Sequence, residues 1–393
     1  MREPGAPAEA GTISLCVPQM TGNEWAYVKE CLDTNFVSSV GKFVTRFERE
    51  FAARVGASHA VATGTGTAAL HVALLVAGVQ PGDLVLVSAL SFIAPANAIR
   101  YCEAMPYFID VEPEHWQMDP RCIAEFLEDQ CERRAGELFH RDTGRRVSAI
   151  VPVHILGHPA RMGAILELAA QFDLRVVEDA TESLGATVDG MPAGTLGDLG
   201  CFSFNGNKLI TTGGGGMIVT NDAAAAARAK YLSTQAKDDA IEFVHNAVGF
   251  NYRLTNVQAA IGVAQMEHLD AFIARKRAIA GTYRRALRHL PGVSLPAEAE
   301  WAESACWMNA IRLAPGVAKM DRRALMQRLA AGGVETRPLW QALSESPAHA
   351  AAPSGHCVVA ETLQRECLCL PSSTGLTDAE QQVVIDRVVD ALS

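Results

Sequence analysis

Short runs of consecutive apolar residues recur along the first half of the chain and alternate with segments of helical length. The runs occupy residues 59–63, 83–87, 106–109, 149–153 and 174–177 and are rich in Val, Ile and Leu. Strands that are apolar without alternation are covered on both faces, which is typical of a mostly parallel sheet. Helical patterns at residues 67–77, 123–133 and 164–172 would supply that cover. In such α/β folds, ligands bind at the carboxyl ends of the strands.

The pattern becomes more helical after residue 250. Good helix formers run from residue 256 to 270 and onward to 290. Beyond about residue 291, expected strands at 306–313 and 367–370 mix with expected helices at 321–331 and 378–392. We therefore expect a flexible tail at 1–12, a large domain at 13–265 and a small C-terminal α+β domain at 266–393.

Composition narrows the class of protein further. The 393 residues are 49% hydrophobic and 20% charged, which fits a compact soluble protein rather than a disordered chain or a coiled coil. The net charge of −10 argues against nucleic acid as a partner. We find neither a secretory signal nor a membrane span, so we expect a cytoplasmic protein without a membrane partner. The ten cysteines form no CxxC pair, which indicates neither a disulfide framework nor a zinc site.

One lysine stands apart from the other six. Lys29, Lys230, Lys237 and Lys276 lie beside other charges on expected helix surfaces, where a solvated ammonium is sufficient explanation. Lys208 instead lies between an expected strand at 201–204 and the glycine run 213–216, which precedes another strand at 217–220. Consecutive glycines indicate backbone that bends sharply or closely approaches something. An amine at such a strand end is suited to Schiff-base chemistry.

A carboxylate follows the expected strand at 174–177. Asp179 would lie at the carboxyl end of that buried strand, where a charge without a partner is costly. The protonated pyridine nitrogen of pyridoxal phosphate (PLP) is such a partner, because the carboxylate keeps the ring an acceptor of electrons. The alternative is that Asp179 only caps the next helix.

A phosphate site would complete a place for this cofactor. The sequence ATGTGTA at residues 62–68 joins a strand to a helix through a Gly/Thr turn, which exposes unpaired N–H groups and the positive end of the helix dipole. Alone this signal is weak, because many α/β turns carry glycine for steric reasons. Together with Asp179 and Lys208 it predicts PLP as the cofactor.

Six stretches of the chain resemble a known family in the same order. They are GTGTAALHVALLVAGVQPGDLVLV, SFIAPANAIRY, PVHILGHPA, VEDATESLGA, CFSFNGNKLITTGGGG and GFNYRLTNVQAAIGVAQME. They resemble the DegT/StrS-type nucleotide-sugar aminotransferases, which are PLP enzymes of fold type I. The resemblance covers about residue 13 to the end. SVGKFV, EDATES, FNGNK, QAKDD and ETRPLW are most similar to the branch that aminates UDP-linked 4-keto-6-deoxy N-acetyl sugars, as in bacillosamine and legionaminic acid synthesis.

The resemblance implies a role in cofactor binding for several positions. Lys208 would form the Schiff base, Asp179 would pair with the pyridine nitrogen, and Phe92 would stack on the ring. Glu182 would lie near the phenolic oxygen of the cofactor, where many relatives carry Gln or His. A carboxylate and a phenolate repel each other, so either Glu182 or the phenolic oxygen should hold a proton. The phosphate would be held by Gly66, Thr67, Ala68 and Ser203, together with Asn251 from the neighbouring subunit of a homodimer.

Other residues are weaker candidates with ordinary alternatives. Phe92 by itself would more often be a core aromatic residue. His154 and His158 lack an acidic third ligand at a set spacing, so we expect no metal. Arg337 and Trp340 are either surface and core residues or contacts to the sugar nucleotide. Further substrate candidates from the resemblance are Ser38, Ser39 and Lys42.

These residues predict an enzyme that transfers an amino group from L-glutamate to C4 of a UDP-linked 4-keto-6-deoxy-N-acetylhexosamine. A second hypothesis keeps the chemistry but uses GDP-4-keto-6-deoxymannose, as a perosamine synthase does, or aminates C3. A third is a vestigial PLP-binding regulator without turnover. A PLP-dependent sugar dehydratase is disfavoured by Lys208, because known relatives of that kind lack lysine at this position.

Overall fold

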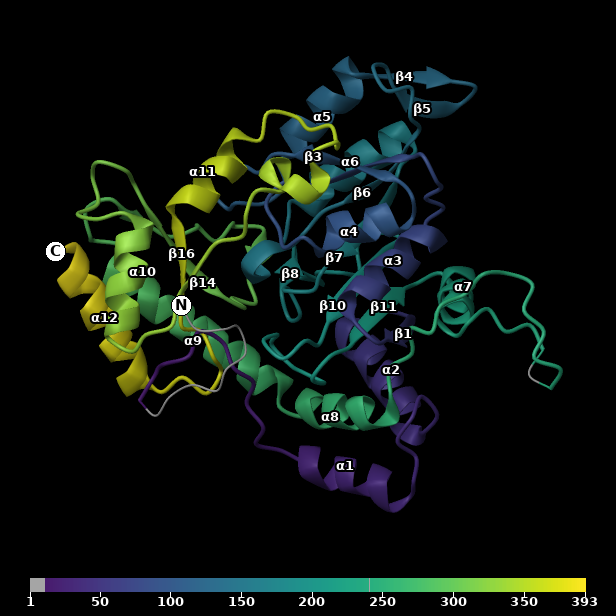
Figure 1. Cartoon of the computed structure of the whole chain (residues 1–393), viewed down its shortest axis with the longest axis horizontal. Coiled ribbons are helices and arrows are strands. Elements are labelled where there is room, and N and C mark those ends of the chain that lie inside the picture. Colours follow the sequence, from purple (N-terminus) through teal and green to yellow (C-terminus); the bar gives the residue numbers. More distant parts are fainter. Residues whose placement is uncertain (1–10, 240) are drawn as a thin grey trace.

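A seven-stranded sheet forms the centre of the computed structural model, which describes residues 11–239 and 241–393 (Figure 1). Its strand order is β1-β11-β10-β7-β6-β2-β3, and β11 alone runs antiparallel to its neighbours. The mostly parallel mixed sheet is thereby confirmed. Its strands are β1 (His59–Thr63), β2 (Leu84–Ser88), β3 (Met105–Ile109), β6 (Val147–Val151), β7 (Arg175–Asp179), β10 (Leu199–Ser203) and β11 (Gly216–Thr220).

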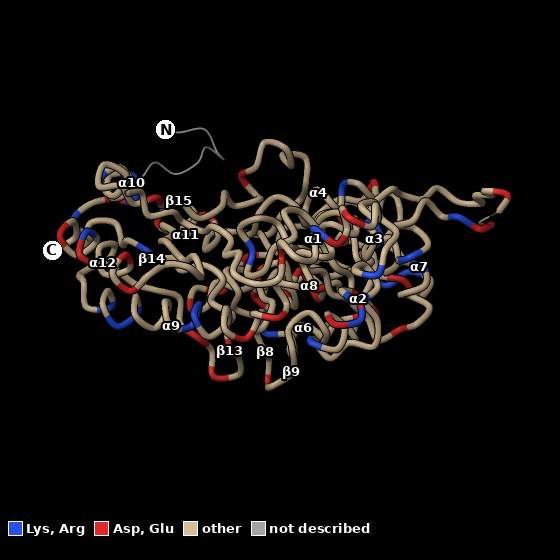
Figure 2. Tube along the Cα trace, turned by 90° about the horizontal axis from the view of Figure 1, so that it is seen from below, with Lys and Arg blue, Asp and Glu red and all other residues tan. Residues whose placement is uncertain are grey.

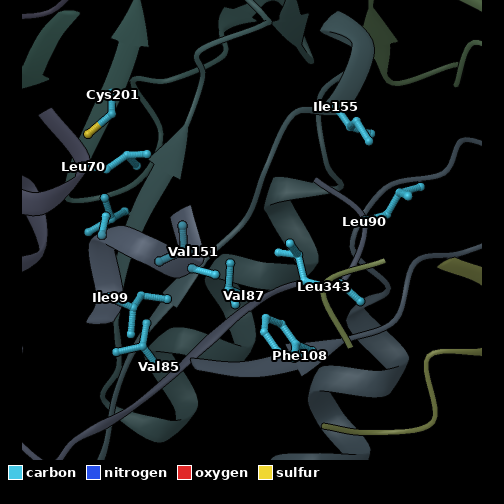
Figure 3. Close-up of a cluster of buried hydrophobic side chains, with 14 of the residues drawn as sticks. Leu70, Val85, Val87, Leu90, Ile99, Phe108, Val151, Ile155, Cys201 and Leu343 are labelled. Carbon is cyan, nitrogen blue, oxygen red and sulfur yellow. The ribbon is translucent and has the colours of Figure 1, made fainter. Parts of the chain in front are cut away.

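Helices cover both faces of this sheet, as the uninterrupted apolar strands predict. Along β2, Val85 and Val87 enter a core with helices α3 (Gly66–Val76) and α4 (Ala94–Tyr101), shown in Figure 3. Leu84 and Leu86 point the other way, into a core with α5 (Pro120–Asp129) and α6 (Met162–Phe172). A third core joins β10 and β11 to α2 (Lys42–Val55) and α8 (Asn256–Met266).

A second sheet belongs to the C-terminal part of the chain. Its strand order is β12-β14-β16-β15. Its core is built with α9 (Leu269–Leu287), α10 (Arg322–Ala331) and α12 (Asp378–Leu392). The strands are β12 (Val293–Ser294), β14 (Asn309–Leu313), β15 (Arg337–Pro338) and β16 (Cys367–Leu370), and α11 (Val358–Glu366) precedes β16. The small α+β unit agrees with the expectation, whereas a domain boundary at residues 265–266 stays a prediction.

The N-terminal segment packs against this C-terminal part. The amide of Ile13 donates to the carbonyl of Gly333 at 2.8 Å, and the amide of Val17 donates to the hydroxyl of Ser373 at 3.0 Å. Residues 13–17 are therefore fixed by partners more than 300 positions away. Of the tail predicted at 1–12, residues 1–10 lie outside the described residues.

Several sequence predictions of local structure were wrong. The expected helix at 123–133 ends at Asp129, and the chain continues as β4 (Cys131–Arg134), which pairs with β5 (Glu137–His140). The expected helix from 256 to 290 is two helices, because α8 packs into the core beneath the central sheet and α9 into the C-terminal core. The sequence analysis also missed α1 (Glu24–Asp33), α2 and the small sheet of β8 (Thr187–Val188), β9 (Met191–Pro192) and β13 (Ala302–Glu303).

The chain leaves the body of the molecule after α7 (Ala223–Ser233). The segment between α7 and α8 projects outward in both views (Figures 1 and 2). It carries Ile241, Phe243 and Val248, whose side chains are exposed. Among the described helices, none is long and apolar enough to cross a membrane.

Candidate active site

A cavity of about 970 Å³ opens at the carboxyl ends of the central strands. Its wall on the side of the central sheet includes Asp179 at the end of β7, Ser203 at the end of β10 and Phe92 after β2. Residues of the C-terminal part, including Trp307 and Arg337, form another wall. The position agrees with the site expected from the parallel sheet.

Lys208 projects into this cavity from the loop between β10 and β11. Its Nζ lies 3.5 Å from Oε1 of Glu182 and 4.2 Å from the centroid of the Trp307 ring. The Lys208 side chain is 14% exposed, so it is largely shielded but remains on the cavity wall. The ammonium therefore contacts a carboxylate and an aromatic face while the cavity stays open to it.

The glycines after Lys208 are explained by backbone geometry. Gly213 and Gly215 have φ values of +78° and +152°, which disfavour a side chain. A Cβ at Gly216 would lie 2.5 Å from the carbonyl oxygen of Thr65, so β11 approaches the start of α3 closely. The predicted bend and close approach are thus confirmed, and the group that the backbone approaches is the Thr65 carbonyl.

Two adjacent carboxylates at the end of β7 have different surroundings. Glu178 is fully buried and accepts hydrogen bonds from the amides of Gly194, Leu196 and Gly197 and from Nε2 of His154. Asp179 is 2% exposed and lies on the cavity wall, and its carboxylate accepts one from the Thr181 amide at 3.1 Å. Burial raises the pKa of Asp179. Glu178 is satisfied by the protein, whereas Asp179 is placed to pair with a cation in the cavity.

Glu182 lies beside Lys208 and is also buried. Its Oε2 accepts a hydrogen bond of 2.8 Å from the amide of Leu156, and its Oε1 faces the Lys208 ammonium. Burial raises the pKa of Glu182, although Lys208 opposes the shift. A raised pKa favours the protonated acid, which is the form that can donate a hydrogen bond to a phenolate.

The start of α3 has the form of an anion site. Thr65 is the N-cap, and its hydroxyl accepts a hydrogen bond of 3.0 Å from the Ala68 amide. The Ala68 amide is therefore already hydrogen-bonded within the protein, although Ala68 was expected to help hold the phosphate. Gly66 and Thr67 line the cavity. A Cβ at Gly66 would lie 2.8 Å from Cβ of Ser203, so only glycine lets the helix start approach β10 this closely.

Gly66→Ala should therefore weaken PLP binding about tenfold or more, because overpacking of this kind costs about 1–3 kcal/mol and displaces Ser203 from the helix start. Gly163→Ala, on α6, is the matched control because a Cβ at Gly163 would have no atom within 4 Å. Fluorescence titration of both apoproteins with PLP measures the difference. Equal affinities would contradict the close approach as the reason for glycine.

The remaining candidates divide into those on the cavity wall and those away from it. Phe92 lies on the wall with its side chain 55% exposed, so it is not the core aromatic that its residue type alone suggested. Arg337 and Trp340 also line the wall, and Arg337 pairs with Glu335 at 3.2 Å. The wall of this chain's own cavity does not include the described residues Ala68, Asn251, Ser38, Ser39 and Lys42.

The residues away from the cavity make other contacts. The Ser39 hydroxyl accepts a hydrogen bond from Arg253, and Lys42 pairs with Glu30 at the start of α2. Asn251 forms an isolated bridge with Thr234 and is exposed. Their roles toward a cofactor or substrate stay predictions.

His154 and His158, which the sequence analysis did not expect to bind a metal, form hydrogen bonds within the protein. Nδ1 of His154 accepts the Ala160 amide at 3.0 Å, so its Nε2 carries the proton that is donated to Glu178. Nε2 of His158 accepts the Ala299 amide at 3.1 Å, and burial lowers the pKa of this imidazole to about 4.

The sequence analysis missed several residues of the cavity wall. Trp307, Glu335 and Cys16 come from distant segments, and only the fold brings them to Lys208. The Trp307 and Trp340 rings are stacked, with centroids 6.1 Å apart. In ETRPLW, Glu335 lies two positions before Arg337. Residues two apart in an extended segment point to the same side, so the prediction of Arg337 at the site could have been extended to Glu335.

The residues present fit PLP. Lys208 supplies an amine and Asp179 a buried carboxylate that faces the cavity, while the Gly66 helix start supplies amides for a phosphate. The exposed Phe92 ring supplies a surface for an aromatic cofactor. An α/β fold with this arrangement is that of a PLP-dependent enzyme of fold type I.

Comparison with known proteins agrees with this class. The sequence model of the DegT/DnrJ/EryC1/StrS aminotransferase family matches residues 18–389, and the chain belongs to this family. It is similar to GDP-perosamine synthase of Caulobacter vibrioides, with 40% identity over 97% of both chains, and to GDP-perosamine synthase of Escherichia coli O157:H7, with 38% identity over 95% of this chain and 96% of the other. The fold is similar to that of DesV of S. venezuelae, solved in complex with a ketimine intermediate, with a TM-score of 0.84, 31% identity and 94% of each chain covered.

The protein is thus a PLP-dependent sugar aminotransferase, as the sequence predicted. The aminotransferase relatives favour an active enzyme over the vestigial regulator.

Proposed function

We propose that this enzyme transfers an amino group from L-glutamate to C4 of a UDP-linked 4-keto-6-deoxy-N-acetylhexosamine. The observation that carries the proposal is the position of the Lys208 amine, in one cavity with Asp179 on one wall and Arg337 and Trp340 on another. A guanidinium suits a diphosphate, and an indole suits a sugar or base face. The motif ETRPLW, which supplies both residues, is one of the five stretches that resemble the UDP-sugar branch.

Each residue of the site has a defined task in this reaction. Bound PLP supplies an electron sink for the carbanion that forms at the donor carbon or at sugar C4. The Lys208 amine is the general base and acid that moves a proton to and from these carbons. Asp179 balances a positive charge at the end of β7, and protonated Glu182 donates toward an oxygen beside Lys208. The Trp307 ring holds the Lys208 ammonium between proton transfers.

A GDP-linked 4-keto-6-deoxymannose is the second candidate substrate. It is favoured by the two relatives that are GDP-perosamine synthases and match this chain over nearly its whole length. Both substrates present a C4 ketone and a diphosphate, so the chemistry at Lys208 is the same.

The experiment that separates the substrates supplies ¹⁵N-glutamate with either keto sugar and detects the labelled amino sugar by mass spectrometry. We expect label in the UDP-linked N-acetyl sugar, with kcat/KM at least about a hundredfold above that of the GDP sugar, since mispaired polar groups cost several kcal/mol. Label only in the GDP sugar would contradict the UDP substrate but leave amino transfer intact. Label in neither would contradict the proposed reaction.

We also propose that two copies form a homodimer with shared active sites. Large apolar side chains are exposed in two segments, with Trp25, Phe36 and Val40 in one and Ile241 and Val248 in the other. Exposed apolar surface of this kind is typical of a protein interface. Asn251 follows the second segment and lies off the cavity of its own chain, which supports its predicted contact with the partner's cofactor.

Mixing of two inactive variants tests this shared site. Lys208→Ala and Asn251→Ala should each be inactive, and a refolded equimolar mixture should recover about a quarter of the wild-type activity, because half of the dimers are hybrids with one intact site. A mixture of Lys208→Ala with Asp179→Ala is the control and should recover none, since both residues belong to one chain's cavity. No recovery in the first mixture, despite subunit exchange, would contradict a shared site.

A further inference from the structure

Lys276 on α9 is a buried lysine, contrary to the surface position expected from its sequence neighbours. Its side chain is among the largest fully buried ones, with 1% exposure, and burial lowers its pKa. Among the ion pairs of residues 11–239 and 241–393, no carboxylate partner of Lys276 is found. Burial of an ammonium without a counter-ion is costly, so the position requires an explanation.

The three acceptors of Lys276 come from three separate segments of the chain. Its Nζ donates to the carbonyl of Trp307 at 2.7 Å and to the carbonyl of Ser372, and it lies 3.7 Å from Sγ of Cys16. An ammonium has three protons, and each has an acceptor here. Lys276 therefore ties together the N-terminal segment, the segment before β14 and the segment after β16.

Two of these partners meet again at one carbonyl next to Lys208. The Asn207 carbonyl accepts a hydrogen bond of 2.7 Å from Nε1 of Trp307 and one of 3.1 Å from the thiol of Cys16. This peptide belongs to the loop after β10, where no strand partner fixes the backbone. Cys16 and Trp307 thus hold the peptide that precedes Lys208.

Trp307 acts on Lys208 in a second way. Its ring lies beneath the Lys208 ammonium, at 4.2 Å from Nζ to the centroid. The same residue therefore fixes both the main chain and the amine of the lysine segment, and Lys276 fixes Trp307 through its carbonyl.

We propose that Lys276 is a positioning residue for Lys208, which it orients through Cys16 and Trp307. The buried ammonium holds these two side chains against the Asn207 peptide, so that the Lys208 amine faces Glu182 and the cavity. The inference rests on the proposed role of Lys208 in forming an imine with PLP. It means that the reaction of Lys208, which follows a strand of the central sheet, depends on a residue of α9 in the C-terminal part.

The test compares two reactions of the Lys208 amine in full-length apoprotein. Imine formation with PLP requires a free amine that is also positioned, whereas labelling by trinitrobenzenesulfonate, located by mass spectrometry, requires a free and accessible amine but no particular position. Lys276→Met keeps the volume but removes the three donors, so we expect imine formation to slow about tenfold while labelling of Lys208 does not slow. Lys319→Met, at an exposed lysine bonded to Ser393, is the control and should change neither rate.

Coupling to Trp307 provides an independent readout. Trp307→Phe retains a ring but loses the donor to Asn207, and its effect on imine formation should be much smaller in the Lys276→Met background than in wild type. The proposal would be overturned if the two substitutions slowed imine formation independently, so that their fold-changes multiply in the double variant. An unchanged rate of imine formation in Lys276→Met would also overturn it.

Two further outcomes are distinguishable. If Lys276→Met does not fold, Cys16→Ala removes one acceptor of Lys276 and one donor to Asn207, and an unchanged imine rate in that variant would overturn the proposal. If wild-type Lys208 forms no imine at all, the proposed function fails, which the wild-type sample alone reveals.

Discussion

Lys208→Arg is expected to lower the rate of transamination by at least about 10⁴-fold, because it removes both the nucleophilic amine and the group that moves the proton. A guanidinium is always protonated and cannot serve as a base near neutral pH. Stopped-flow measurement of the glutamate half-reaction determines the loss directly.

The fold should survive this change. Arginine can still place a cation between Glu182 and the Trp307 ring, where the Lys208 ammonium lies. Lys230→Arg is the matched control, because Lys230 pairs with Glu48 outside the cavity wall. We expect wild-type turnover in the control and Tm values within a few degrees in both. Measurable multiple turnover in Lys208→Arg would show that another group supplies the amine.

Asp179→Asn is expected to reduce kcat about a thousandfold in an otherwise folded enzyme. The carboxylate is 2% exposed and faces the cavity, so a pyridinium nitrogen would be paired with it in a dry environment. Removal of one partner of a buried pair costs about 3–5 kcal/mol, which corresponds to about 10²–10⁴ in rate if it is lost in the transition state. Asp189→Asn, in an exposed turn with φ of 49°, is the control and should be neutral.

The same substitution should have the opposite effect on the apoprotein. Burial raises the pKa of Asp179 above the ordinary value of 3.8, so the folded state binds this proton more tightly than the unfolded state. The resulting stabilisation is present at low pH and is lost as pH rises through the folded-state pKa. Asp179→Asn cannot titrate, so its free energy of unfolding should fall less steeply with pH and exceed the wild-type value near neutrality.

Urea unfolding of both apoproteins across this pH range measures the difference, and PLP should reverse the order of stability. A steeper decline in Asp179→Asn would contradict an uncompensated buried carboxylate. Glu182, whose pKa burial also raises, should keep part of the pH dependence in both proteins.

The central sheet was predictable because its strands are buried on both faces. The runs expected at 59–63 and 83–87, which are apolar throughout at 60–62 and 84–87, match the bounds of β1 and β2 within one residue. The C-terminal helix α12 was predictable for a different reason, because Thr377 and Glu380 form a capping box at its start. Lys208 and Asp179 could be proposed as a pair because Asp179 ends such a strand and Lys208 lies in the loop that follows another.

The second wall of the cavity could not be predicted, because it depends on contacts between distant segments. Cys16 and Asn207 are 191 positions apart, and no local pattern indicates that they touch. Lys276 has charged neighbours in sequence, yet tertiary packing turns its face of α9 inward. The helix expected at 123–133 included residues 131–133, among which Glu and Arg are good helix formers, but pairing of 131–134 with 137–140 decides their conformation.

The most direct test of the account is to reduce the holoenzyme with borohydride and locate the pyridoxyl group by peptide mass spectrometry. The account predicts a single modified peptide, which contains Lys208, and bleaching of the visible absorption when glutamate is added before reduction. A pyridoxyl group on any other lysine, or none after incubation with PLP, would contradict the claim that Lys208 holds the cofactor and carries the reaction.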